Sequence, residues 1–154
     1  MHPPAAAKPA PTPPQRVIAF EVRDYECDMD HVVNNAVYLN YLEHARHKLL
    51  ESSDLQFGEL SRRGISLVVT RIEIDFRASL HSGDAFVVHT VLRRKGRLRL
   101  QFEQRIVRRG DERLIANAVV LGTALNAQGR PEIPAALDAA LARLVDTANT
   151  APAA

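Results

Sequence analysis

A single long helical pattern, in a chain whose other regular segments alternate between apolar and polar residues, is the feature that most restricts the fold. From Ala36 to Ser52 apolar side chains recur at helical spacing, which predicts a helix with one apolar stripe. The stripe consists of Tyr38, Tyr41, Leu42, Ala45 and Leu49. Alternating patterns predict strands over residues 16–22, 71–77, 85–92, 97–103 and 114–125.

These elements indicate an α+β fold. A single-faced antiparallel sheet needs another element to cover its apolar side, and residues 36–52 form the only long helix available. We therefore expect an antiparallel five-stranded sheet wrapped around one long central helix. A helical turn or loop over residues 55–63, closed by Gly64, and a short C-terminal helix over residues 134–145 complete the prediction.

Length and composition indicate one globular domain. The 154 residues leave no room for a second full core, and 46% hydrophobic with 25% charged residues is ordinary. We expect residues 1–15 to be a disordered arm rich in proline and alanine, residues 16–148 to form the domain, and residues 149–154 to be a flexible tail. No apolar run is long enough for a membrane-spanning helix.

Charge and cysteine content narrow the functional class. A formal net charge of +2 is too small to indicate nucleic-acid binding by itself. Cys27 is the only cysteine, so no intrachain disulfide can form, and a reducing compartment such as the cytoplasm is the simplest inference. The thiol of Cys27 is either a nucleophile or a small buried hydrophobic group.

The segment before the long helix carries the chemistry. Its acidic residues end a strand, and Asn34 and Asn35 then precede the helix. Either asparagine is a good N-cap, because its amide oxygen can accept a free N–H bond at the helix start. The pattern places the carboxylate of Asp28 beside that helix end, where partial positive charge stabilises anions. A carboxylate and an anion-stabilising helix end are a minimal set for acyl chemistry.

Two metal-site interpretations of this region are weaker. Acidic residues recur at every second position from 24 to 30, as oxygen ligands do in a calcium loop. Such a loop would need glycine where Met29 stands and glutamate where Asn35 stands. We expect Asp24, Glu26 and Asp30 to be solvated or paired with basic residues. On the helix, Glu43, His44 and His47 lack the order and the third ligand of a zinc site. We therefore expect a polar helix face, with no metal and no cofactor.

A basic cluster stands in the second half of the chain and consists of Arg93, Arg94, Lys95 and Arg97. One interpretation is a solvated hairpin turn. The other is a substrate-binding site for the phosphates of coenzyme A or the acidic surface of an acyl carrier protein (ACP). Nucleic acid is a poor fit, because no aromatic residues interleave with the arginines.

The same motifs resemble a known family. Glu26-Cys27-Asp28, the run from Val33 to Tyr38, and the run from Glu43 to Arg46 resemble hotdog-fold thioesterases of the 4-hydroxybenzoyl-CoA thioesterase type. Within them, the chain looks closest to plant single-hotdog acyl-ACP thioesterases and related bacterial acyl-CoA thioesterases. The likeness extends through Phe76 and the run 82–84 to the final strand. It implies a single hotdog fold, which agrees with the sheet and helix expected above.

The resemblance also implies roles for site residues. Asp28 matches the catalytic carboxylate, which acts as nucleophile or as general base for water. The backbone N–H of Asn35 matches the group that polarises the thioester carbonyl, and Asn34 would cap the helix or bind water. Tyr38 would belong to the core or line the acyl pocket. His31 departs from the family, whose members usually have glycine there. Histidine tolerates positive φ better than most residues, and it adds a titratable group near Asp28.

The expected function is hydrolysis of acyl-CoA or acyl-ACP in fatty acid metabolism, by a homodimer or homotetramer. Two alternatives stay open on the same fold. One is a non-catalytic acyl-binding or assembly protein, which would not need Asp28. The other is a dehydratase, which would need a histidine and acid pair such as His31 and Asp28. The sequence does not define the acyl chain or the carrier.

Overall fold

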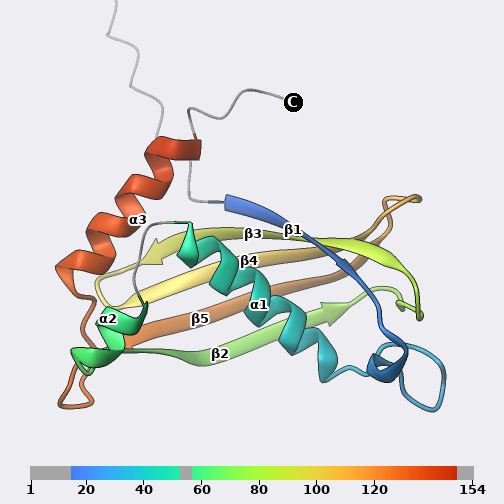
Figure 1. Cartoon of the computed structure of the whole chain (residues 1–154), viewed down its shortest axis with the longest axis horizontal. Helices are drawn as coiled ribbons and strands as arrows, with labels where there is room; N and C mark the ends of the chain where they lie inside the picture. Colours follow the sequence, from blue (N-terminus) through green and yellow to red (C-terminus); the bar gives the residue numbers. More distant parts are fainter. Residues whose placement is uncertain (1–14, 53–56, 149–154) are drawn as a thin grey trace, which may run out of the picture.

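The architecture is one antiparallel sheet with a long helix packed across one face (Figure 1). This computed structural model describes residues 15–52 and 57–148. The strands are β1 (Gln15–Glu21), β2 (Ser66–Phe76), β3 (Ala85–Lys95), β4 (Arg99–Arg108) and β5 (Leu114–Leu125). The helices are the 3-10 turn η1 (Asp24–Glu26), α1 (Val37–Glu51), α2 (Phe57–Arg62) and α3 (Ala135–Ala148). The strand order is β1-β3-β4-β5-β2, and every neighbouring pair is antiparallel.

The predicted stripe of the long helix is its buried face. All five stripe residues of α1 are at most 4% exposed, which confirms both the helix and its orientation. The stripe contributes to two hydrophobic clusters. One lies around Leu42 and Phe86, and the other lies around Leu49 and Leu92. Burial of this face, at roughly 25 cal/mol per Å² of apolar surface, is what holds a lone helix against the sheet.

A buried polar bridge ties the centre of α1 to the sheet. The Nε2 of Gln104, on β4, donates to the carbonyl of Leu42 at 3.0 Å and to Oγ1 of Thr90 at 2.9 Å. Its Oε1 accepts from Nη1 of Arg46 at 3.0 Å. Gln104 and Thr90 are each 1% exposed. Because these buried groups cannot bond to water instead, moving the helix would leave them without hydrogen-bond partners. The bridge therefore fixes where α1 crosses the sheet.

The strand predictions hold, with differences at the ends. β5 matches its expected range, whereas β3 runs three residues past Leu92 and so takes in Arg93, Arg94 and Lys95. β2 begins five residues before its predicted start, and β4 ends five residues after its predicted end. Gln15, the last residue of the expected arm, opens β1 and pairs with Val91. The remaining predictions for residues 1–14, 53–56 and 149–154 lie outside the described residues.

β2 is an edge strand whose inward side is less buried than its alternation suggests. Ile72 and Phe76 are 39% and 49% exposed. β2 pairs with β5 on one side and has no neighbouring strand on the other within the described residues. These side chains are therefore only partly covered in a single chain.

The short helices agree with their sequence signals. Gly64 ends α2 with a φ of 73°, a left-handed conformation that glycine adopts at no steric cost. The predicted C-terminal helix is α3, and its Leu137 and Leu141 are buried. None of the described helices is long and apolar enough to cross a membrane.

We expect Gln104→Leu to lower the free energy of unfolding by about 2–4 kcal/mol, because three buried partners lose their hydrogen bonds at once. Urea unfolding at neutral pH measures the change. Gln101→Leu is the matched control on the same strand, since among the described residues the Gln101 side chain bonds only Glu103, on the other face of the sheet. An equal loss in both variants would contradict the role of the bridge.

Candidate functional site

The acidic segment folds into a small closed loop between η1 and α1. A bridge between Cys27 and Val33 closes its base, and the N–H of Asp28 donates to the carbonyl of Val32 at 2.9 Å. The N–H of Val33 donates to the carbonyl of Leu80 at 2.9 Å, which fastens the loop to the segment before β3. Asp28 is therefore held by backbone contacts on a rigid turn.

Asp28 is half-buried. One of its carboxylate oxygens, Oδ1, accepts the N–H of Asp30 at 2.9 Å. No hydrogen bond within the described residues uses Oδ2, so one carboxylate oxygen remains available to a water or a substrate. Asp30 is exposed in the same loop and forms no ion pair with a described residue.

His31 shows how the loop accommodates the residue that departs from the family. Its φ is 60°, and its N–H donates to the carbonyl of Asp28 at 3.0 Å. This is the left-handed conformation that glycine would adopt freely and that histidine tolerates better than most residues. The side chain is exposed, and no hydrogen bond joins it to Asp28.

The start of α1 differs in detail from the predicted cap. The capping position is Ala36, not an asparagine, and it has no side-chain cap. The amide oxygen of Asn34 still accepts the N–H of Ala36 at 2.9 Å, and its carbonyl accepts the N–H of Val37. Among the described residues, the N–H of Asn35 has no partner. A free main-chain donor therefore stands at this helix end.

The asparagine pair is fastened to the acidic loop. The N–H of Asn34 donates to the carbonyl of Glu26 at 3.0 Å, so Asn35 and Asp28 lie on two hydrogen-bonded backbone segments. Asn35 and Tyr38 line a pocket of about 310 Å³ beside Phe76, at the end of β2. Tyr38 is 3% exposed, so it belongs to the core and also to this wall. Asp28 is not among the lining residues in the single chain.

A buried carboxylate beneath the loop was not predicted. Glu26 is 8% exposed, and its Oε2 accepts the hydroxyl of Tyr41 at 2.6 Å and the N–H of Arg23 at 2.8 Å. Its Oε1 pairs with Nη1 of Arg23 at 3.6 Å. The expectation that Glu26 is either solvated or paired with a basic residue is confirmed by its ion pair with Arg23. Burial and the bond to Glu26 raise the pKa of Tyr41 well above its usual value.

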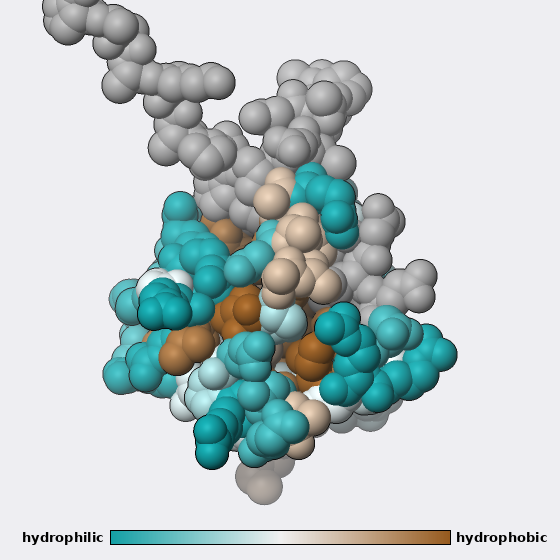
Figure 2. Space-filling model, turned by 90° about the vertical axis from the view of Figure 1, so that its left-hand side faces the viewer, coloured by the Kyte–Doolittle hydropathy of each residue, from teal (hydrophilic) through white to brown (hydrophobic). Residues whose placement is uncertain are grey.

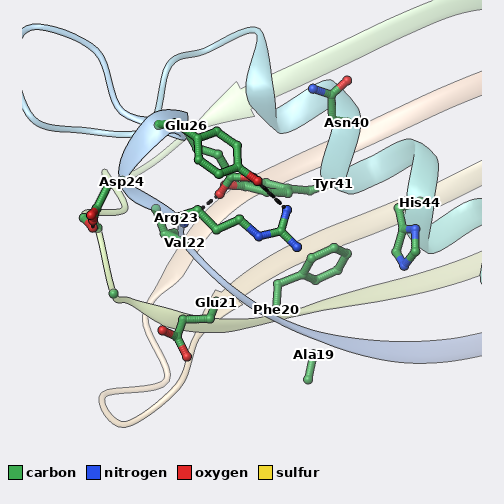
Figure 3. A pocket seen from close by; sticks show the side chains of 13 residues that line it. Ala19, Phe20, Glu21, Val22, Arg23, Asp24, Glu26, Asn40, Tyr41 and His44 are labelled. Carbon is green, nitrogen blue, oxygen red and sulfur yellow. Dashed lines mark hydrogen bonds and ion pairs between the residues drawn. The ribbon is translucent and has the colours of Figure 1, made fainter.

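Glu26 and Tyr41 line a second, larger pocket of about 860 Å³ on the β1 side of α1 (Figure 3). His44 and Asn40 border it from the helix, and Figure 3 shows Arg23 and Glu26 near Tyr41. Asp28 and Asn35 do not line it. Its buried carboxylate, Glu26, is already paired with Arg23, so the larger size of this pocket does not by itself make it the better candidate for acyl chemistry.

The basic cluster lies far from the loop in the same chain. Arg93, Arg94 and Lys95 end β3, whereas the loop is fastened next to the start of β3. Ten strand residues span about 33 Å. Arg94 instead pairs with Asp138 of α3, at 3.6 Å, and its Nη2 donates to the carbonyl of Arg97. The solvated-hairpin interpretation is confirmed, because β3 and β4 form an antiparallel hairpin and all four basic residues are exposed at its tip. Arg97 lies in the turn, whereas Arg93, Arg94 and Lys95 belong to the strand that leads into it.

The remaining candidate residues, Cys27, His44 and His47, have ordinary structural contacts. Cys27 is half-buried against the core, as expected of a small hydrophobic group. The ring of His44 packs edge-on against Phe20. Nε2 of His47 lies 3.8 Å from Oε1 of Glu43 on the exposed helix surface. Within residues 15–52 and 57–148, no three histidine, cysteine or acidic side chains are grouped to hold a metal ion.

Comparisons with known proteins agree on the family. The family described as Thioesterase-like superfamily matches residues 22–141. The chain is 40% identical to the chloroplastic acyl-acyl carrier protein thioesterase ATL2 of Arabidopsis thaliana, over 74% of this chain and 61% of that protein. It is 31% identical to the long-chain acyl-CoA thioesterase FadM of Escherichia coli, over 66% and 76%. The chain thus spans about three fifths of the length of the Arabidopsis relative.

A solved structure supports the fold. A 1,4-dihydroxy-2-naphthoyl-CoA thioesterase from Synechocystis superposes with a TM-score of 0.77 at 20% identity, over 83% of this chain and 96% of that one. At this identity the likeness shows the hotdog fold alone, which confirms the architecture predicted from the sequence.

We expect Tyr41→Phe to lower the free energy of unfolding by about 1–3 kcal/mol, since the buried Glu26 carboxylate loses a short hydrogen bond. Thermal or urea unfolding measures the change. Tyr25→Phe is the matched control, because the Tyr25 hydroxyl accepts from Arg23 at the surface and the residue is 77% exposed. A Tyr41→Phe protein as stable as the control variant would show that the bond holds nothing in place.

Proposed function

This chain belongs to the thioesterase-like superfamily, and from that membership we propose that it hydrolyses an acyl thioester to a free acid and a thiol. The observation that carries the proposal is the pairing of two groups on adjoining backbone segments. One is the half-buried carboxylate of Asp28, and the other is the unpartnered N–H of Asn35 on a pocket wall. Acyl transfer needs these two functions, an oxygen nucleophile and a donor for the developing oxyanion.

The proposed reaction is simple because the leaving group is good. A thiol has a pKa of roughly 8.5, so thiolate departs with little help from an acid. Asp28 takes the proton from an attacking water, or attacks the carbonyl itself and is then released by water. The carbonyl oxygen gains negative charge as the new C–O bond forms, and the Asn35 N–H stabilises it. The C–S bond then breaks, and the thiolate leaves to take up a proton.

The carrier is proposed as coenzyme A or acyl carrier protein. FadM is named for the first carrier and ATL2 for the second. The basic cluster is the proposed contact for phosphates or an acidic carrier surface. Since that cluster lies at the far end of β3 from Asp28, we propose that it serves a site completed by another subunit.

A second subunit is proposed at the open edge of β2. Apolar side chains face that edge from the strand and from the neighbouring side of α1. They are Leu39, Val69, Ile72 and Phe76, each 39–49% exposed. Pairing of two β2 strands would cover these side chains and give the backbone groups at the strand edge their hydrogen-bond partners. It would also close one side of the pocket beside Asn35. We propose a homodimer, or a homotetramer built from it, in the cytoplasm.

We expect Asp28→Asn to lower kcat on acyl-CoA substrates by at least about 100-fold while the fold is retained. The amide keeps an oxygen to accept the Asp30 N–H, so the loop stays in place. Release of free thiol from a panel of acyl thioesters measures turnover, and thermal unfolding checks the fold.

Asp30→Asn is the matched control, because Asp30 is exposed in the same loop, and it should keep the wild-type kcat. Unchanged turnover in Asp28→Asn would remove this carboxylate from the mechanism. His31→Asn separates the dehydratase alternative: asparagine also adopts positive φ, so hydrolysis should persist. A wild-type protein that binds acyl thioesters without cleaving them would favour the acyl-binding alternative.

Sedimentation should give a mass at least twice that of one chain. Ile72→Lys should shift the protein toward monomer, because a charge would be buried at the proposed interface. Val17→Lys is the matched control on the other edge strand, β1, where Val17 is 53% exposed. A stable monomer in the wild type would contradict the proposed assembly.

A further inference from the structure

A third pocket, of about 350 Å³, lies between the C-terminal half of α1, α2 and the start of β2. Its walls are mostly apolar and include Leu50, Leu60 and Leu67. Figure 2 looks onto the end of the molecule that carries α2 and α3, where hydrophobic side chains gather within a rim of hydrophilic ones. Small-molecule pockets in proteins start at about 300 Å³, so the space suits a compact ligand.

Arg46 lines this pocket, and it is 7% exposed. Its Nη1 donates to Oε1 of Gln104, and its guanidinium carbon lies 5.8 Å from the centre of the Phe102 ring. Within the described part of the chain, Arg46 forms no ion pair with a carboxylate. Burial lowers its pKa, as expected of a cation that lacks a partner of opposite charge. A buried cation without a counter-ion is unusual.

The rest of the guanidinium forms no hydrogen bond with a described residue, and it is not completely shielded. An arginine has five N–H donors, and the contact with Gln104 accounts for one nitrogen. Among the described residues, no side-chain nitrogen that is completely shielded lacks a hydrogen-bond partner. Any nitrogen of Arg46 that lacks a partner is therefore accessible, and the space beside the residue is the pocket that it lines.

The nearest acid does not fill this role. Glu43 lies one turn earlier on α1, and its charge favours the protonated form of Arg46. However, its carboxylate lies 3.8 Å from Nε2 of His47 at the exposed rim. Glu43 thus lines the pocket as an acidic residue at its rim, and its charge weakens the attraction of the pocket for an anion.

We propose that this pocket binds the carboxylate of a short-chain or medium-chain alkyl acid, with the carboxylate on Arg46 and the alkyl chain against the leucine walls. A guanidinium and a carboxylate form two parallel charge-assisted hydrogen bonds, which supplies the missing counter-ion. The apolar walls supply the remaining affinity. This inference goes beyond the proposed function and does not depend on thioester hydrolysis.

The test is direct binding to the full chain, measured by calorimetry with octanoate and octan-1-ol. The wild type should prefer octanoate by about 10- to 100-fold, the range expected of a charge-assisted pair. Affinity should rise by about fourfold for each methylene added from pentanoate to octanoate. Glu43→Gln should tighten octanoate binding, because it removes a like charge from the rim.

Arg46→Met should abolish the preference for octanoate and keep the binding of octan-1-ol, which also reports that the pocket is intact. Arg71→Met is the matched control: Arg71 is an exposed arginine of β2 that pairs with Glu73 and does not line the pocket. Ser61→Trp, at an exposed position of α2 that does line the pocket, should block both ligands.

Two results would overturn the proposal. One is a wild type that binds octanoate no better than octan-1-ol. The other is octanoate binding that survives both Arg46→Met and Ser61→Trp, which would place the ligand elsewhere. If Arg46→Met does not fold, the wild-type preference and the Ser61→Trp variant still decide the question.

Discussion

The packing of α1 across the sheet is the constraint on which the other features depend. One helix covers the apolar face of five strands, so its position sets the shape of every pocket around it. Apolar burial alone would let the helix slide, since contacts between leucines are not directional. The bond from Gln104 to the Leu42 carbonyl is directional, and it defines one crossing point. The start of α1, with its free Asn35 N–H, is thereby placed relative to the sheet.

The same helix also holds the acidic loop from beneath. Tyr41, one turn into α1, bonds to Glu26 at the base of the loop, and Asn34 bonds to the Glu26 carbonyl. The loop and the helix end are therefore parts of one rigid unit. Rigid placement matters for acyl chemistry, because small displacements of a reacting group cost large factors in rate. In this arrangement the bonds of Glu26 position the loop that carries Asp28, the proposed catalytic carboxylate.

Much of this fold is readable from periodicity, and the errors have physical causes. Alternation defines β5 fully but misses the second half of β4, although both strands have a neighbouring strand on each side. Alternation overstates the burial of β2, because a pattern does not show whether a second chain covers an edge. The burial of Glu26 and Arg46 was not predicted, because residue type alone does not distinguish a charged side chain in the core from one on the surface. A local signal existed for Arg46, which stands four residues after Leu42 and three before Leu49.

The two buried charges on either side of α1 differ in what they need. Glu26 has a tyrosine hydroxyl, a backbone N–H and an arginine, so its own network is closed. Arg46 has one amide oxygen and a ring face, so its network is open. A closed network stabilises a fold, whereas an open one beside an apolar cavity has capacity for a ligand. The pocket beside Glu26 is the larger of the two, but the pocket beside Arg46 is the one with unused hydrogen-bond donors.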